Sequence, residues 1–413
     1  MINSDRVMQS YRAHLSSTQA VMASMLGSPV EISASGSVVT AADGREYLDC
    51  GGHGVFLLGH RCGAIVDAVK AVLDTQPIQS RFLLNPTVAA GAEALIGIAP
   101  QGLDRVIFQS SGTEAVETAI KLARLAGRRR LISMRGGYHG KTMGALTLMA
   151  NVDHRQPFAP LLPDAASVEF GNSDALRDVV TRYPGDCCVV VEPVQGEGGV
   201  RIPPTGYLSD VAESCHESGA LLVLDEIQTG LGRTGSWWCG AESVAPDILV
   251  CGKILGGGVV PASATVTSAE IFGPLHRDPG LHSSTFANAP LIAAAAKATI
   301  DLIRDTGLLS RVRAVGDRVI ETLRTATEPF GDIVRDVRGI GLLAGVEFFD
   351  VDSAGTFLLE LLSRGVMPTF SQTNAGVVRF TPSVYLSDAQ IGWLASSVTQ
   401  ALQATAEALR VPE

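Results

Sequence analysis

The sequence is poor in charged residues and has no long basic run. Only 18% of its 413 residues are charged, and the formal net charge at pH 7 is −10. The one basic cluster, residues 128–130, directly precedes the apolar Leu131 and Ile132 and is typical of a solvated strand entrance. Surfaces that bind nucleic acid or anionic lipid need compensating positive charge. We therefore expect neither a nucleic-acid partner nor a membrane partner.

The sequence also lacks a long apolar run and any regular cysteine spacing. Its longest apolar helix candidate, residues 291–303, is interrupted by Lys297 and Asp301, so we expect no membrane span. The first residues do not resemble a signal peptide. Neither a Cys-x-x-Cys pair nor a His-Glu-x-x-His motif occurs, so we expect no metal site. The seven scattered cysteines predict buried thiols in a reducing compartment, and hence a cytoplasmic protein.

The order of the expected elements predicts an α/β chain with a large and a small domain. From residue 105 onward, short β-branched runs alternate with helical patterns, which predicts a mostly parallel sheet covered on both faces. We expect its strands at residues 105–109, 130–134, 187–193, 221–225, 247–251 and 262–267. We assign residues 61–306 to the large domain.

The two chain ends should form the smaller α+β domain. After residue 306 we expect a long helix at 308–327, strands at 333–338, 342–349 and 377–381, and a final helix. The N-terminal residues 1–60 contain only short strands near 37–40 and 46–49. They are too few for a sheet of their own, so we assign them to one domain with residues 307–413.

Lysine is scarce, and one of the five lysines has an unusual setting. Lys70, Lys121 and Lys297 lie in helical patterns that favour a solvated face. Lys253 instead follows an apolar strand and precedes three glycines at residues 256–258. Burial lowers the pKa of a lysine, and a neutral amine is the form that attacks an aldehyde to make a Schiff base. A lysine that turns out to solvent would give the same pattern, so this feature alone leaves both interpretations open.

A carboxylate ends another apolar strand. Residues 221–224 are apolar and lead into Asp225 and Glu226, which places carboxylates at the ligand edge of the sheet. A buried carboxylate needs a cationic partner, because an unpaired buried charge is costly. A protonated pyridine nitrogen would serve, and Asp225 would then keep that ring electron-withdrawing. Strand-edge acids that cap helices give the same pattern, and this alternative stays open.

The segment 110–114 has the composition of a phosphate site. Ser111, Gly112 and Thr113 lie between a strand and an amphipathic helix, where free N–H groups and the helix dipole favour an anion. Serine followed by Glu114 is equally the pattern of an ordinary capping box.

A second loop, residues 136–142, resembles a nucleotide P-loop because it contains Gly-Lys-Thr. That motif requires glycine where this chain has Arg135, so an ATPase is disfavoured. The loop instead offers the ring of Tyr138, which could lie flat on a planar cofactor.

Together these segments resemble the class III aminotransferases, a branch of the fold-type I pyridoxal 5′-phosphate (PLP) enzymes. The motifs follow the family's order from about residue 36 to the C-terminus and include SSGTEAVETAIKLAR, GGYHGKTMGAL, VVVEPVQGEGGV, LVLDEIQTGLGRTG, PDILVCGKILGGG, STF and VRFTPS. The stretches FGNSDALR, RQPFAPLLP, LDCGGHGVFLLGH and LHSSTF are most similar to the putrescine (diamine) aminotransferase branch. The resemblance implies a large PLP-binding domain, a small domain from both chain ends, and an obligate homodimer with active sites at the interface.

The resemblance also implies a role for each matching residue. Lys253 would hold PLP as a Schiff base and later move a proton at the substrate carbon. Asp225 would pair with the pyridine nitrogen, and Gln228 would contact the phenolic oxygen. The rest of the implied cofactor-binding set is Gly112 and Thr113 with Thr285 of the partner subunit at the phosphate, Tyr138 stacked on the ring, Glu192 beside the cofactor, and Ser111 and His139.

For the substrate, the resemblance implies a switch between two charged residues. Glu197 would pair with Arg379 while an amine donor is bound and release it when glutamate or 2-oxoglutarate arrives. With Lys253 and Asp225, Glu197 completes the implied catalytic group. Phe56 should face the substrate and would suit an apolar chain.

Two departures from the family pattern bear on specificity. Many members have arginine where this chain has Lys141, and a lysine point charge does not replace the bidentate fork that holds an α-carboxylate. The usual Gly-Gly-Asn-Pro is Ala-Asn-Ala-Pro at residues 287–290, which puts extra side chains near the subunit boundary.

The resulting expectation is an aminotransferase that moves an amino group from a terminal amine, either a diamine or an ω-amino acid, to a keto acid such as 2-oxoglutarate or pyruvate. The reverse amination of an aldehyde is equally expected. The alternatives are an acetylornithine- or ornithine-type transaminase, a same-fold racemase, aminomutase or decarboxylase, and a non-catalytic PLP-binding protein.

Overall fold

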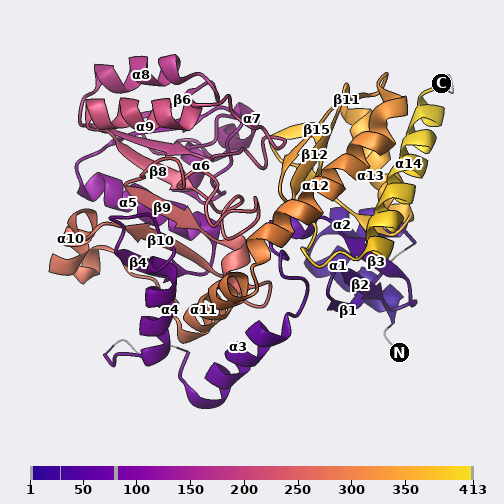
Figure 1. The fold of residues 1–413 in the computed structure, drawn as a ribbon, viewed down its shortest axis with the longest axis horizontal. Helices are drawn as coiled ribbons and strands as arrows, with labels where there is room; N and C mark the ends of the chain where they lie inside the picture. Colours follow the sequence, from indigo (N-terminus) through magenta and orange to yellow (C-terminus); the bar gives the residue numbers. More distant parts are fainter. Residues whose placement is uncertain (1–2, 28, 79–81, 411–413) are drawn as a thin grey trace.

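The chain folds into two lobes that lie side by side (Figure 1). The structure is a computed structural model that describes residues 3–27, 29–78 and 82–410, so the outermost residues of the predicted segments 1–60 and 307–413 fall outside it. Both chain ends belong to the same lobe, and the middle of the chain forms the other. Within the described residues, no helix has the length and apolar character that a membrane span requires.

A seven-stranded sheet organises the large lobe. Its strand order is β4-β10-β9-β8-β7-β5-β6, and every pairing is parallel except those of β10, which is antiparallel to both of its neighbours. The mostly parallel sheet predicted from the alternation of strands and helices is therefore confirmed. The strands are β4 (Arg105–Gln109), β5 (Arg130–Met134), β6 (Ala165–Val168), β7 (Cys187–Val191), β8 (Leu221–Asp225), β9 (Ile248–Cys251) and β10 (Ser263–Thr267).

Helices cover both faces of this sheet. Because successive side chains of a strand point to opposite faces, neighbouring residues pack against different helical layers. Val190 and Val223 belong to the core shared with α5, whereas Val189 and Leu224 belong to the core shared with α8, α9 and α11. Strands β7, β8 and β9 are buried along their whole length, as parallel strands between two helical layers must be. The helices of this lobe are α3 (Gly63–Thr75), α4 (Pro86–Ile96), α5 (Gly112–Leu125), α6 (Met143–Thr147), α7 (Val152–Arg155), α8 (Ser173–Arg182), α9 (Tyr207–Ser218), α10 (Ala269–Arg277) and α11 (Pro290–Asp305).

The small lobe contains two four-stranded sheets. The first has the order β1-β2-β3-β13, and β13 from the C-terminal part of the chain lies parallel to β3 from the N-terminal part. The N-terminal strands thus share a sheet with the C-terminal segment, although the boundaries at residues 60 and 306 stay a prediction. The strands are β1 (Glu31–Ser35), β2 (Val38–Ala41), β3 (Glu46–Asp49) and β13 (Val366–Met367).

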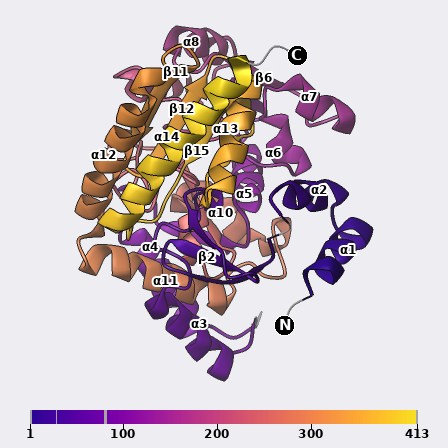
Figure 2. The same cartoon turned by 90° about the vertical axis from the view of Figure 1, so that its right-hand side faces the viewer.

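The second sheet has the order β11-β12-β15-β14 and is antiparallel throughout. Helices α12, α13 and α14 lie together across one of its faces (Figure 2), while α1 and α2 project away from them. The elements are β11 (Val334–Ile340), β12 (Leu343–Phe348), β14 (Thr369–Ser371), β15 (Asn374–Phe380), α1 (Ser4–His14), α2 (Ser17–Met25), α12 (Leu308–Thr327), α13 (Val351–Ser363) and α14 (Asp388–Arg410).

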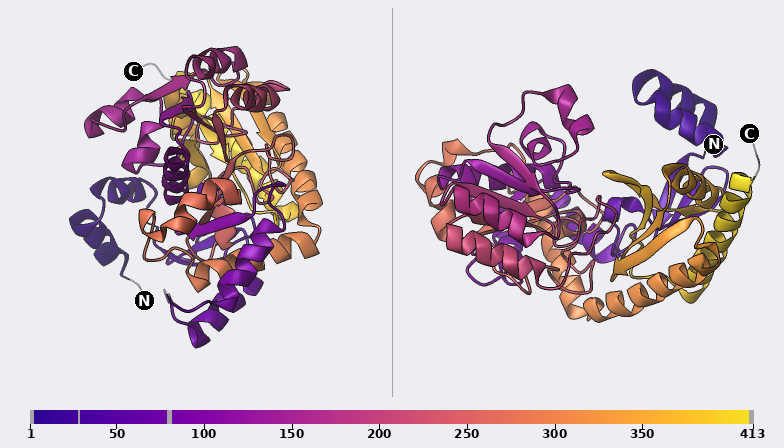
Figure 3. Two further views of the ribbon diagram at one scale, coloured as in Figure 1. Left: turned by 90° about the vertical axis from the view of Figure 1, so that its left-hand side faces the viewer. Right: turned by 90° about the horizontal axis from the view of Figure 1, so that it is seen from above.

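The loops that follow β5, β7 and β8 run between the two lobes (Figure 3). One buried side chain from these loops ties the lobes together. Arg233 donates hydrogen bonds to the carbonyl oxygens of Leu342, Pro382 and Gly54, at 3.0, 2.8 and 3.1 Å. The carboxyl ends of the parallel strands are therefore covered by the second lobe.

Candidate active site

A cavity of about 420 Å³ lies at the carboxyl ends of β5, β7, β8 and β9. Parallel strands that point the same way bring their following loops to one edge of the sheet, which is where open α/β sheets bind ligands. Most of the predicted site residues line this cavity: Gly112, Thr113, Tyr138, His139, Lys141, Glu192, Glu197, Asp225, Gln228 and Lys253. Their positions come from five separate segments of the sequence.

Lys253 begins the short helix that follows β9. Its φ of 47° is in the left-handed region, which is uncommon for a residue other than glycine and is found where surrounding structure forces a side chain into a functional position. The Nζ atom donates a hydrogen bond to Oε1 of Gln228. Burial lowers the pKa of Lys253, although Glu197 nearby opposes this effect. The site therefore favours the neutral amine that can attack an aldehyde.

Asp225 ends β8 and is paired with a buried histidine. Its Oδ2 atom lies 2.7 Å from Nδ1 of His139, and its Oδ1 atom accepts a hydrogen bond from the Ile227 N–H at 3.1 Å. Burial works against a charged His139, but the hydrogen bond and charge of Asp225 outweigh it, together with the charge of Glu192, so the pKa of His139 is raised. Asp225 is therefore held rigidly at the cavity wall.

The first turn of α5 forms another wall of the cavity. Gly112 and Thr113 carry N–H groups that have no acceptor within the helix, and both residues line the cavity. Ser111 caps the helix instead: its Oγ accepts from the Glu114 N–H, and the Glu114 carboxylate accepts from the Ser111 N–H at 2.9 Å. The capping box and an anion site are thus both present, because the cap leaves the next two N–H groups available.

The P-loop alternative does not match the geometry of the helix after Lys141. The carboxylate of Glu117 accepts hydrogen bonds from the Gly144 and Ala145 N–H groups at 2.9 and 3.1 Å, and from the Thr142 hydroxyl. A carboxylate therefore occupies the start of α6, where a P-loop would bind phosphate. Nothing in the sequence singled out Glu117 for this contact.

Two glutamates follow β7. Glu192 accepts hydrogen bonds from the N–H groups of Tyr138 and Gly196, at 2.8 and 3.2 Å. Burial raises the pKa of Glu192 to about 7, against the opposing charge of His139. A carboxyl group with this pKa is close to the balance between its neutral and charged forms at neutral pH.

Glu197 and Arg379 form a buried ion pair between the lobes. The Nη2 atom of Arg379 donates to Oε1 of Glu197 at 2.7 Å, and the Gln372 N–H donates to the other carboxylate oxygen at 3.1 Å. Burial would raise the pKa of Glu197, but the charges of Arg379 and Lys253 and the hydrogen bonds from Arg379 and Gln372 together outweigh it, so the pKa is lowered. Among the described residues, Nε and Nη1 of the fully buried Arg379 have no hydrogen-bond partner, so this guanidinium keeps unused donors.

The lining of the cavity does not include four of the predicted site residues: Phe56, Ser111, Thr285 and Arg379. Phe56 stacks on His60, with ring centroids 3.9 Å apart, and does not line the cavity. Thr285 lies on an exposed stretch, where its expected contact with a partner subunit stays a prediction. Lys141 lines the cavity but is exposed.

The arrangement fits PLP. The buried amine of Lys253 matches the aldehyde of PLP, the carboxylate of Asp225 matches its pyridine nitrogen, and the helix start with free N–H groups matches its phosphate. Two further buried atoms, Nε2 of His139 and Nε2 of Gln228, have no hydrogen-bond partner among the described residues. These features define the class of PLP-dependent transferases.

Comparison with known proteins places the chain more narrowly. The family model "Aminotransferase class-III" matches residues 24–402. The chain therefore belongs to the class III aminotransferases and is a PLP-dependent transaminase. The resemblance stated from the motifs is confirmed at the level of the family.

Solved structures agree with this assignment. An ornithine aminotransferase from Toxoplasma gondii ME49 is 28% identical, with a TM-score of 0.89, over 99% of this chain and 97% of that one. An (S)-enantioselective omega-transaminase from Thermomicrobium roseum is 26% identical, with a TM-score of 0.90, over 98% and 99%. An amine transaminase from an uncultivated Pseudomonas species, solved in its PLP-bound form, is 28% identical, with a TM-score of 0.84, over 91% and 95%. The predicted fold-type I architecture is thereby confirmed.

We expect the free energy of unfolding of the cofactor-free protein to include a pH-dependent contribution from the His139–Asp225 pair. A folded pKa raised above the ordinary value of 6.5 means that the pair stabilises the protein fully below that pH and loses its effect as the pH rises through the raised pKa. The loss of stability caused by His139→Asn, measured by urea unfolding, should therefore be larger near about pH 6 than near about pH 9. A loss that grows with pH would contradict the pairing.

Proposed function

We propose that this aminotransferase takes its amino group from a terminal amine, such as a diamine or an ω-amino acid, and passes it to a keto acid such as 2-oxoglutarate or pyruvate. The same chemistry in reverse would aminate an aldehyde. The observation that carries the proposal is Lys141, an exposed point charge on the cavity wall. Many family members have an arginine there, whose planar fork holds the α-carboxylate of an amino acid.

The proposal is supported by the kinds of transaminase found among similar structures. An omega-transaminase and an amine transaminase are among them. The putrescine-type branch suggested by the sequence motifs is one form of this proposal. An ornithine-type enzyme, whose substrate also carries an α-carboxylate, is the second candidate, because ornithine aminotransferases are also among the similar structures.

We assign the following roles at the cofactor. PLP supplies, when bound, an aldehyde that bonds to amines and a ring that withdraws electrons. Lys253 would hold the cofactor covalently and then move a proton at the substrate carbon, a role toward which burial shifts the amine by lowering its pKa. Asp225, oriented by His139, would keep the ring nitrogen protonated. The other proposed contacts are Gln228 at the phenolic oxygen, Ser111, Gly112 and Thr113 at the phosphate, Tyr138 against the ring, and Glu192 beside it.

The Glu197–Arg379 pair would let one site accept two different substrates. While the pair is closed, the arginine charge is neutralised and a cationic amine can enter. A dicarboxylate would displace Glu197 and use the unsatisfied Nε and Nη1 donors of Arg379. Closing and opening this pair would select donor and acceptor in turn.

We further propose a homodimer that acts in the cytoplasm. Helices α1 and α2 project from the small lobe (Figures 2 and 3) and expose the apolar Leu15, Met22 and Met25. Phe286, next to Thr285, is also about half exposed. Apolar surface of this kind suits a subunit interface. In the dimer, Thr285 of the partner subunit would complete the phosphate site.

Lys253→Ala should abolish turnover and remove the visible absorbance of covalently held PLP. The loss should be at least about a hundredfold, because the variant lacks the proposed acid–base group. The exposed Lys70 on α3 offers a control, and Lys70→Ala should keep both the absorbance and the rate. Normal transamination by Lys253→Ala would overturn the central assignment.

The donor is tested with a panel of diamines, ω-amino acids and α-amino acids against 2-oxoglutarate and pyruvate. We expect kcat/KM to be highest for donors without an α-carboxylate. Lys141→Arg should raise kcat/KM for α-amino acids by about tenfold, as one additional charge-assisted hydrogen bond would. A wild-type enzyme that prefers α-amino acids would refute the proposed donor class.

Arg379→Ala should separate the two half-reactions. We expect kcat/KM for 2-oxoglutarate to fall by about a hundredfold, since one partner of a buried charge contact is lost, while a diamine loses much less. Single-turnover rates for each half-reaction measure this difference. Equal losses for donor and acceptor would show that the pair does not act as a switch.

A further inference from the structure

The turn that carries Glu197 has a strained backbone. It spans residues 196–200, and the Gly196 carbonyl accepts hydrogen bonds from the N–H groups of Gly199 and Val200, both at 3.2 Å. Gly199 has a φ of 96° and Val200 a φ of 54°. Positive φ is costly for a β-branched residue, so the turn keeps this shape only because its surroundings fix it.

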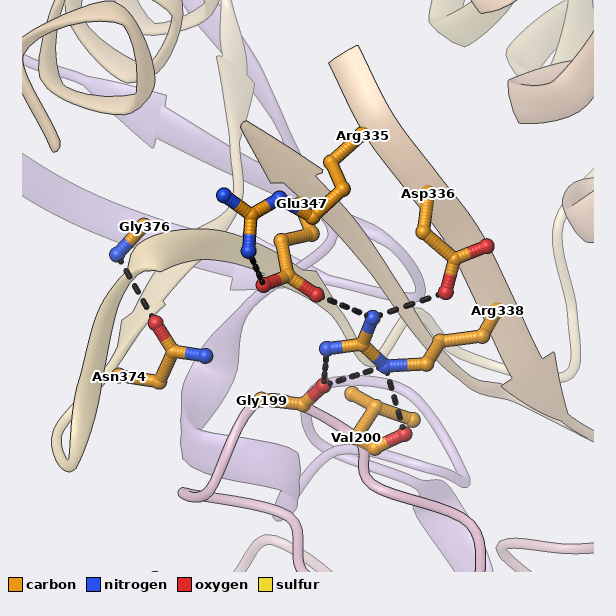
Figure 4. A network of polar contacts seen from close by, with 8 residues as sticks. All are labelled: Gly199, Val200, Arg335, Asp336, Arg338, Glu347, Asn374 and Gly376. Carbon is orange, nitrogen blue, oxygen red and sulfur yellow. Dashed lines mark hydrogen bonds and ion pairs between the residues drawn. The ribbon is translucent and has the colours of Figure 1, made fainter. Parts of the chain in front are cut away.

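Arg338 on β11 is the side chain that holds this turn from the small lobe (Figure 4). Its Nε atom donates to the carbonyl oxygens of Gly199 and Val200 at 2.9 and 3.1 Å, and its Nη2 atom donates to Gly199 at 2.6 Å. These carbonyls lie two and three residues after Glu197. Arg338 itself does not line the active-site cavity, so it can reach the chemistry only through the turn.

Two carboxylates fix the guanidinium of Arg338 in this position. Its Nη1 atom donates to Oε2 of Glu347 on β12 at 2.5 Å and to Oδ2 of Asp336 at 2.9 Å. The side chains of Arg338 and Glu347 are only 18% and 17% exposed, so water screens this pair weakly. Arg335 also approaches Glu347, at 3.7 Å, but its side chain is 52% exposed.

Glu197 is held on its other side by the turn between β14 and β15. The Thr373 N–H and hydroxyl both donate to the Glu197 carbonyl, at 3.0 and 2.9 Å, and the Gln372 N–H donates to its carboxylate. Arg379 lies further along β15. The carboxylate of Glu197 thus meets Arg379 only if the strained turn and the small-lobe sheet keep their relative positions.

We propose that Arg338 is a positioning residue for the Glu197–Arg379 pair and thereby sets the balance between amine donor and dicarboxylate acceptor. The inference rests on the switch role of that pair in the proposed function. Without Arg338, the turn relaxes and Glu197 covers Arg379 less completely. The exposed arginine charge then disfavours a cationic amine, whereas a dicarboxylate no longer has to displace a well-placed carboxylate.

The test uses the full-length, PLP-loaded enzyme and the variant Arg338→Gln. We expect kcat/KM for the amine donor to fall by about tenfold, the effect of losing one hydrogen bond from a charged group, while the value for 2-oxoglutarate changes little. Arg338→Lys should give an intermediate result, because it keeps the charge but loses the planar fork. A crystal structure of Arg338→Gln should show Glu197 and Arg379 no longer within hydrogen-bond distance.

Arg335→Gln is the matched control. It removes a cation near the same carboxylate of Glu347 without a contact to the turn, so both half-reactions should stay within about twofold of wild type. Glu347→Gln keeps Arg338 but loosens its anchor, and it should shift the donor–acceptor ratio in the same direction as Arg338→Gln. This second variant decides the question if Arg338→Gln does not fold.

Equal losses in both half-reactions, together with a lowered unfolding temperature, would show that Arg338 only stabilises the fold. An unchanged Glu197–Arg379 distance in the Arg338→Gln crystal structure would also overturn the proposal. Arg379→Ala could change kcat/KM for donor and acceptor unequally while Arg338→Gln does not. The positioning role of Arg338 would then be wrong, and the switch role of the Glu197–Arg379 pair would stand. If Arg379→Ala affects donor and acceptor equally, the switch role is wrong. The Glu197–Arg379 distance in the Arg338→Gln crystal structure then tests by itself whether Arg338 positions Glu197.

Discussion

The constraint on which the whole site depends is the burial of parallel strands between two helical layers. Strands β7, β8 and β9 have no exposed residue, so a polar side chain can be placed only where the strand ends. Asp225 is the last residue of β8, Glu192 follows β7 directly, and Lys253 follows β9 after one glycine. Because the three strands are parallel neighbours, these ends meet at one edge. The sheet therefore assembles an amine and two carboxylates from segments far apart in the sequence.

Much of the large lobe could be predicted because its signals are local. The apolar runs at β4, β5 and β8 and the helix α12 have the bounds expected from the sequence. Strand β6, with the sequence Ala-Ala-Ser-Val, was missed because alanine and serine give a weak strand signal, and its pairing with β5 is what makes it a strand. The two-residue β13 was missed because its ladder depends on β3, which is far away in the sequence, and the three-residue β14 is too short for a periodic pattern.

The candidate site also has a part that the sequence predicts and a part that it does not. Motif positions were enough to bring Lys253, Asp225, His139 and Gln228 to one cavity. The contacts that fix the surrounding loops could not be foreseen, because a sequence pattern does not specify which carbonyl or N–H a side chain will meet. Glu117 on α5 accepts from N–H groups at the start of α6, and Thr373 in the β14–β15 turn donates to the Glu197 carbonyl.

The buried arginines Arg233 and Arg379 lie close enough for their charges to interact. Burial, together with the nearby charge of Arg379, lowers the pKa of Arg233 to about 9. Arg233 is held by three carbonyl oxygens, which orient its guanidinium but do not neutralise it. The nearby Arg379 is instead paired with the carboxylate of Glu197. A substrate carboxylate that reached Arg379 would replace Glu197 as its partner, whereas an amine requires the arginine charge to stay covered. In the proposed switch, the position of Glu197 and the contacts that fix it therefore matter most in the half-reaction with the amine donor. No substrate carboxylate is then present to neutralise Arg379.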